Sequence, residues 1–162
     1  MFQNSLESVR KNGIDWVQDL GRKNVEDLLT IIQWNEDHVT FLRLAHGPAD
    51  NQPFFLFLQN IRFFRISSEM FPFASHLVHG YSLKYCADLL AKAGALANKY
   101  DHRLTVHPGQ FTQLGSPKPA VVEAALRELE YHCEMLDLMG IGVDGVMIVH
   151  VSFNIYIFKL FS

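Results

Sequence analysis

Three histidines stand at or just beyond the ends of predicted β-strands, where metal-dependent enzymes often keep their ligands. His107 and His150 end two such strands, and His76 lies in the long loop that follows another. The carboxyl ends of parallel strands meet at one edge of a sheet or barrel, where active sites form. Three converging imidazoles predict a site for zinc, manganese or iron. A single strand-end His is more often a hydrogen-bonded loop residue than a ligand, and for the three together the residue pattern leaves both interpretations open.

The loop at residues 107–112, HPGQFT, places a polar amide beside a large aromatic ring. Its Pro-Gly pair turns the chain sharply, and Gln110 and Phe111 follow the turn. Proteins that open a duplex use an amide to hydrogen-bond a displaced base and a ring to stack on it. The alternative interpretation is an ordinary loop with a buried Phe.

The remaining polar groups favour structural roles. Glu69 follows a predicted strand and is a candidate base or metal ligand, with a capping or surface role as the alternative. We expect the other histidines to be structural, including His132, which lies in the middle of a helix beside Cys133. The carboxylates of that helix are typical of a solvated face; they are Glu123, Glu128, Glu130, Glu134 and Asp137.

Strands alternate with helices along the chain, which predicts an α/β fold with a parallel sheet. We expect strands at 61–66, 104–107 and 146–150, which begin about 42 residues apart. No Gly-rich phosphate-binding motif follows a predicted strand, and this favours a barrel over an open nucleotide-binding sheet.

Helices are predicted at 24–38, 83–99 and 117–139 from their hydrophobic period. Asn24 and Ser116 are the expected N-caps of the first and third helices, and Gly140 is the expected end of the third. The apolar residues of the first helix follow the i, i+3, i+4, i+7 spacing of one buried face: Val25, Leu28, Leu29 and Ile32.

The overall composition excludes several classes of protein. The chain has 162 residues, of which 49% are hydrophobic and 19% charged, and its net charge is −3. These values argue against intrinsic disorder and against a strongly basic nucleic-acid module. The two cysteines, Cys86 and Cys133, are expected to be free buried thiols in a reducing compartment. With no long apolar run and no secretory signal, the sequence predicts one soluble intracellular domain.

Two stretches interrupt the regular pattern. Residues 39–59 have apolar clusters without a helical period, and residues 151–162 are aromatic and β-branched with a single charge. The second stretch is typical of an aggregation-prone tail rather than of the polar loop that should follow a strand.

Several long segments resemble the UV-damage endonuclease family in its fungal branch. They are RLTVHPGQFTQLGSP at 103–117, IRFFRISSEMFPFASH at 61–76 and DGVMIVH at 144–150. Residues 20–38 and 121–140 are similar to that family too. The resemblance implies a partial TIM barrel, with three to four βα units of eight, in residues 1–150, an irregular insertion at 39–59 and a non-family tail at 151–162.

This resemblance also implies an activity: metal-dependent hydrolysis of the phosphodiester 5′ to a photolesion in double-stranded DNA. It implies metal-ligand roles for His76, His107 and His150, with manganese as the expected ion. Gln110 and Phe111 would probe the lesion, although a Tyr is frequent at the second position. A DNA-repair role implies the nucleus or the mitochondrion, and no obligate protein partner is evident.

The sequence departs from the family pattern in ways that predict an inactive chain. The first family strand and the later Glu, Asp, His and modified-Lys metal positions are missing, and three histidines alone leave the charge of several cations unbalanced. Val codons begin with GT and Gln can be CAG, so we hypothesise that residues 39–59 and 151–162 are retained introns. Genomic DNA with other codons at residues 39 and 59 would contradict this.

Two other functions remain open from the sequence. One is another metal-dependent barrel enzyme of the sugar-isomerase type. The other is a non-catalytic chain that binds DNA or a single metal ion.

Overall fold

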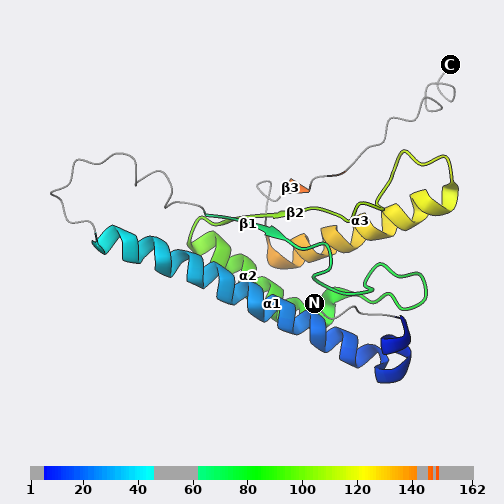
Figure 1. Cartoon of the computed structure of the whole chain (residues 1–162), viewed down its shortest axis with the longest axis horizontal. Coiled ribbons are helices and arrows are strands. Elements are labelled where there is room, and N and C mark those ends of the chain that lie inside the picture. The colour runs from blue at the N-terminus through cyan, green and yellow to red at the C-terminus, as the bar shows by residue number, and fades with distance from the viewer. Residues whose placement is uncertain (1–5, 46–61, 142–145, 148, 150–162) are drawn as a thin grey trace, which may run out of the picture.

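The computed structural model describes residues 6–45, 62–141, 146, 147 and 149 (Figure 1). Its elements are, in chain order, α1 (Leu6–Ala45), β1 (Phe63–Ile66), the short 3-10 helix η2 (Leu83–Cys86), α2 (Ala87–Lys99), β2 (Arg103–Val106), α3 (Pro119–Met139) and β3 (Val146–Met147). The strands form a parallel sheet in the order β1-β2-β3. The predicted alternation of strands and helices is confirmed.

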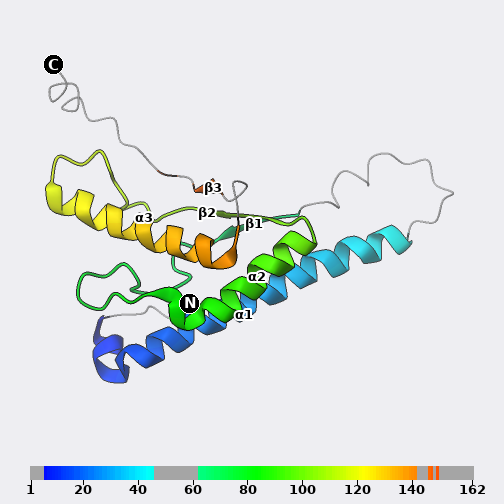
Figure 2. The same ribbon diagram turned by 180° about the vertical axis from the view of Figure 1, so that it is seen from behind.

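All the helices described lie on one side of this sheet. Figures 1 and 2 show α1 and α2 side by side beneath the strands, with α3 on the same side. Side chains alternate between the two faces of a strand, so the register Ile66–Val106–Met147 forms one row that points toward the helices. Ile66 and Val106 are fully buried in the core that this row shares with α1, α2 and α3.

Helix α1 buries the predicted face but has different ends. Val25, Leu28 and Ile32 are buried in the core. Asn24 is not an N-cap, because the helix starts at Leu6 and changes direction at Gly13 (φ 83°). The Asn24 amide instead donates to the Met70 carbonyl at 2.8 Å and ties α1 to the loop after β1.

The helix also continues to Ala45, past its predicted end near His38. The first part of the stretch predicted as irregular, residues 39–45, is therefore helical. The apolar clusters in this segment had suggested a break in the helix, but backbone hydrogen bonding does not require a periodic hydrophobic face. The rest of that stretch and the tail at 151–162 lie outside the described residues.

Helix α3 begins two residues later than predicted, and one of its residues that was expected to be buried is exposed. Ser116 is not its N-cap: its hydroxyl accepts the Lys118 N–H at 3.3 Å before the helix begins at Pro119. Cys133 is exposed, contrary to prediction, whereas Cys86 is buried as expected. Helix α3 ends at Gly140 in the left-handed conformation (φ 63°), as predicted.

Helices α2 and α3 approach closely at one glycine. A Cβ built on Gly94 would lie 1.7 Å from the Met139 carbonyl oxygen, so only a residue without a side chain fits there. This contact fixes α3 against α2 and therefore positions the side chains on the rest of α3. Within the described residues, no helix is long and apolar enough to cross a membrane.

Candidate functional site

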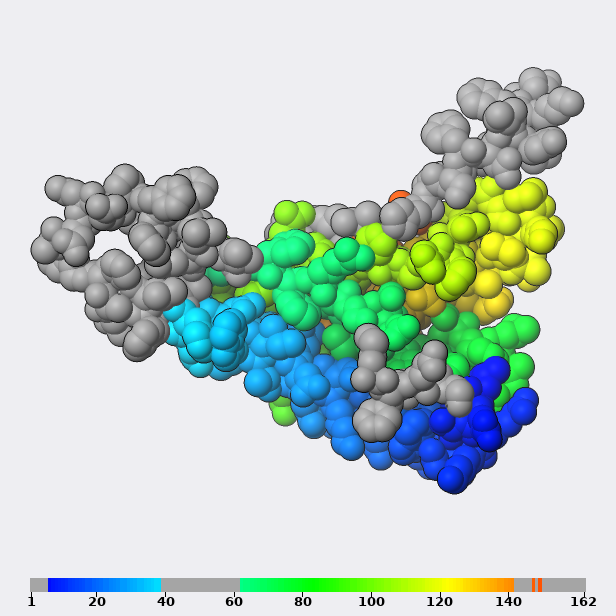
Figure 3. All heavy atoms as spheres, in the orientation of Figure 1, coloured from blue at the N-terminus to red at the C-terminus, as the bar shows by residue number. Residues whose placement is uncertain are grey.

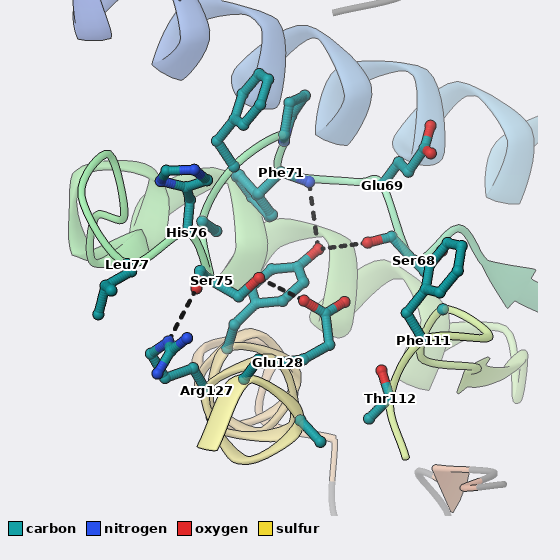
Figure 4. A pocket seen from close by; sticks show the side chains of 17 residues that line it. Ser68, Glu69, Phe71, Ser75, His76, Leu77, Phe111, Thr112, Arg127 and Glu128 are labelled. Atoms are coloured by element: carbon teal, nitrogen blue, oxygen red, sulfur yellow. Dashed lines mark hydrogen bonds between the residues drawn. The ribbon is translucent and has the colours of Figure 1, made fainter. Parts of the chain in front are cut away.

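Two adjoining hollows lie at the carboxyl ends of β1 and β2. The larger, of about 500 Å³, lies between the loop after β1 and helix α3, and its lining includes Glu69, His76 and Phe111 (Figure 4); we call it the His76 hollow. The smaller, of about 410 Å³, is lined by Arg65, His107 and Gln110 among others; we call it the His107 hollow. Ser68 and Gly109 line both, so the two hollows form one continuous surface.

The sheet register explains why these residues meet. Ile66 pairs with Val106 at the ends of β1 and β2, so the loops at 67–82 and 107–118 leave the sheet from the same edge. The structure thus places five residues singled out by sequence along this edge: Glu69, His76, His107, Gln110 and Phe111. His150 lies outside the described residues.

His76 organises the turn that follows it. Its Nδ1 accepts hydrogen bonds from the backbone N–H groups of Val78 and His79, each at 3.1 Å. The ring stacks on His79, with ring centroids 5.1 Å apart, and Phe73 packs edge-on against it. Because Nδ1 needs its lone pair to accept these bonds, the neutral ring carries its proton on Nε2.

The described residues do not fit a metal site on their own. In the part of the chain with assigned positions, no group of three or more His, Cys, Asp or Glu side chains is arranged to hold an ion. The hydrogen bonds of His76 also argue against metal binding. In the neutral ring, Nδ1 uses its lone pair to accept two N–H groups and Nε2 carries the proton, so neither nitrogen has a lone pair free for a metal. Metal binding at this ring requires release of the Val78 and His79 amides or loss of the Nε2 proton.

Glu128 on α3 is the centre of a polar cluster that sequence reasoning missed. Ser75 Oγ donates to Glu128 Oε2 at 2.5 Å, and the fully buried His132 places Nε2 3.3 Å from Oε1. Burial alone would raise the pKa of the Glu128 carboxyl, but the interactions with His132 and Ser75 outweigh it and lower that pKa. Instead of belonging to a solvated face, this carboxylate is partly buried. The i, i+4 spacing of Glu128 and His132 was the available signal.

This cluster does not have the order of a hydrolytic triad. A Ser nucleophile needs an imidazole as its immediate base, with the carboxylate behind the imidazole. Here the carboxylate lies between the hydroxyl of Ser75 and the ring of His132. The arrangement is therefore suited to holding Ser75 in place rather than to activating it.

Two neighbours of Glu128 fasten the same loop to α3 (Figure 4). The buried Tyr131 hydroxyl accepts the Phe71 N–H at 3.3 Å and lies 3.4 Å from the Ser68 carbonyl, to which it donates. Burial raises the pKa of the Tyr131 phenol above its usual range, so the hydroxyl keeps its proton and its donor role. Arg127 Nε donates to the Ser75 carbonyl at 3.4 Å.

The loop at 67–82 lies between helices α1 and α3. Figure 3 shows this segment, in green, between α1 in blue and α3 in yellow. Asn24 of α1 and the three residues of α3 therefore hold it from opposite sides.

Phe111 stands out on the other loop because its ring is exposed. Its relative exposure is 81%, the largest of the large hydrophobic side chains described. The alternative interpretation, an ordinary loop with a buried Phe, is thus wrong. An exposed aromatic ring beside a hollow has a free face on which a planar group can stack.

The sequence is similar to a known family and to several proteins of that family. Residues 54–155 match the model of the family described as UV-endonuclease UvdE. A UV-damage endonuclease of Neurospora crassa is 46% identical over 153 residues, and one of Schizosaccharomyces pombe is 38% identical over 151 residues. Each match covers 91% of this chain, which spans only about a fifth of either relative, 20% and 22% respectively.

A solved structure is similar as well. The crystal structure of SacUVDE is 28% identical in sequence and superimposes with a TM-score of 0.69. The match covers 90% of this chain and 42% of that one. The described elements and their order are therefore those of one part of a larger fold.

Proposed function

Because the chain belongs to the UV-endonuclease UvdE family, we propose that it carries part of the site with which such an enzyme cuts DNA at UV damage. Its fold is a partial TIM barrel, in which parallel strands carry their helices on the outside. The observation that supports the proposal is the shared edge at the ends of β1 and β2, where the loops at 67–82 and 107–118 come together.

Lesion recognition is the part of the activity for which the chain has suitable side chains. We propose that the exposed ring of Phe111 stacks on a base at the damaged step, and that the Gln110 amide hydrogen-bonds a base edge beside it. A photolesion weakens stacking, so a stacking ring enters there at lower cost than in intact duplex. Phe111 needs no hydroxyl for this role.

Enzymes of this family are metal-dependent, and a second proposal concerns which residues hold the ion and which ion it is. We propose that His107 and His150, together with His76 once its Nδ1 is released, hold a divalent cation, with manganese as the expected one. These rings bring no negative charge to offset that of the cation. We therefore expect weak metal binding and little or no cleavage by the 162-residue chain. We further propose that residues 1–150 form the partial barrel domain and that residues 39–59 are an insertion within it.

A nicking assay tests the activity. Supercoiled plasmid, irradiated or not, is incubated with the chain and Mn²⁺, and with a His107→Ala variant as the matched control. Nicking confined to irradiated plasmid and lost in the variant would show that the chain is itself an endonuclease. Equal nicking of both plasmids would argue against lesion recognition.

Binding tests the proposal where cleavage is absent. We expect the chain to bind a short duplex with one thymine dimer more tightly than the undamaged duplex, measured by fluorescence anisotropy. Equal affinity for the two would contradict the proposed function and favour a non-catalytic chain or another metal-dependent barrel enzyme. We further propose a place in the nucleus or mitochondrion, which a fluorescent fusion would check.

A further inference from the structure

Two consecutive apolar side chains are exposed at the tip of the loop after β1. Leu77 is 76% exposed and Val78 is 75% exposed; of the large hydrophobic residues described, only Phe111 is more exposed. A single apolar side chain on a surface is ordinary. Two in succession on a loop tip, close to a third, are typical of a binding surface.

The tip is a built turn rather than a loose loop. His76 Nδ1 accepts the Val78 and His79 N–H groups, and the His76 carbonyl accepts the Gly80 N–H at 2.7 Å. A Cβ at Gly80 would lie 2.5 Å from the His76 carbonyl oxygen, so the turn closes only with glycine at this position.

The base of the turn is fastened too. Tyr81 N–H donates to the Ala74 carbonyl at 3.3 Å, and the Tyr81 hydroxyl donates to the Pro72 carbonyl at 2.7 Å. The backbone that presents Leu77 and Val78 is therefore already ordered. A partner that contacts these side chains does not have to order the turn first, which favours binding.

The turn faces the surface that also carries Phe111. Leu77 and Phe111 both line the His76 hollow, and Figure 4 shows them on opposite sides of it, with Arg127 and Glu128 between them. The Arg127 guanidinium offers a cation between the two apolar edges, beside the carboxylates of Glu69 and Glu128 that line the same hollow. Apolar edges around a cation match a duplex, which offers base and sugar surface beside phosphate.

We propose that the Leu77–Val78 turn is a second contact to damaged duplex, on the side of the hollow opposite Phe111. This inference rests on the proposed function. Apolar side chains that enter a base step kink the duplex and partly unstack it, and a step already weakened by damage resists this least. Two contacts on opposite sides of the hollow hold the weakened step open between them.

The test separates this contact from DNA binding in general. The duplex carries one thymine dimer with 2-aminopurine next to it, a base whose fluorescence rises on unstacking. We expect the wild-type chain to bind and to raise the fluorescence. The Leu77→Ser, Val78→Ser double variant should bind about tenfold more weakly and lose most of the rise. Leu126→Ser, an exposed leucine of α3 that does not line the hollow, should behave as wild type.

The outcomes distinguish the two proposals. A double variant that keeps both the affinity and the fluorescence rise would overturn the second contact and leave the proposed function intact. A wild-type chain that does not prefer the damaged duplex would overturn the proposed function and this inference with it. Thermal melting of each variant by circular dichroism checks that the fold is retained, as expected for exposed positions.

Discussion

The loops after β1 and β2 leave the same edge of the sheet but are held in different ways. The loop at 67–82 is tied to α1 through Asn24 and to α3 through Arg127, Glu128 and Tyr131. The loop at 107–118 has local turns, such as the bond from the Thr112 N–H to the Gly109 carbonyl at 2.9 Å.

The backbone shows the consequence of that difference. Phe73, in the first loop, has a φ of 61°, a left-handed conformation that a residue with a Cβ adopts only when its surroundings impose it. In the second loop, Phe111 instead projects its ring into solvent. We infer that the first loop is a framework fixed by the fold, and that the second presents a probe on local turns.

Removing the Glu128 carboxylate should loosen the loop at 67–82 most strongly and so reduce the difference between the two loops. Glu128→Ala leaves Ser75 without its acceptor and His132 buried beside no carboxylate, so we expect a loss of about 2 kcal/mol in the free energy of unfolding. Urea denaturation measures it. Glu130→Ala, an exposed carboxylate on the same helix, is the control and should change stability little. Equal losses for the two variants would show that Glu128 does not fasten the loop.

Tyr131→Phe should have a smaller effect, localised to the first loop. The variant keeps the buried ring but loses the hydroxyl that bonds the Phe71 N–H and the Ser68 carbonyl, at a cost of about 1 kcal/mol. Hydrogen exchange should become faster at amides of 67–76 and stay unchanged at 107–118. Faster exchange in both loops would mean that the two loops are held together, which would contradict their separate attachment.

Acid should weaken the first loop through Glu128. Because its pKa is lower in the folded chain than in the unfolded one, the unfolded state takes up the proton more readily. The stabilisation is thus present above the ordinary Glu pKa and is lost as the pH falls through the lower, folded value. Urea denaturation at a series of acidic pH values should show a shallower decline for Glu128→Gln than for wild type. Parallel curves would contradict this assignment.

Phe111→Ala, in the loop at 107–118, should leave the free energy of unfolding nearly unchanged, unlike the substitutions that release the loop at 67–82. A ring exposed to solvent contributes little to folding, so we expect a change within about 0.5 kcal/mol. Affinity for duplex with a thymine dimer should fall about tenfold. A large loss of stability with unchanged affinity would assign Phe111 to the framework instead.

Sequence reasoning worked best where a local pattern carries the information. The strand–helix alternation, the buried face of α1 and the stop at Gly140 follow from hydrophobic period and backbone preference, and all are present. It failed at Asn24 and Ser116, because a residue suited to capping caps only if the helix begins there. Asn24 serves a distant carbonyl instead.

By itself, the sequence determined which side chains follow the strands, since His107 must come directly after β2 and Gln110 and Phe111 must follow its Pro-Gly turn. Only the tertiary structure decided which of these side chains are free to act. Long-range packing ties Ser75 to Glu128 and Phe71 to Tyr131, partners that lie 53 and 60 residues apart in the chain. Leu77 and Phe111 stay exposed on either side of the hollow. The physical reason is that burial and hydrogen-bond partners come from residues far apart in the chain, whose spacing no local pattern records.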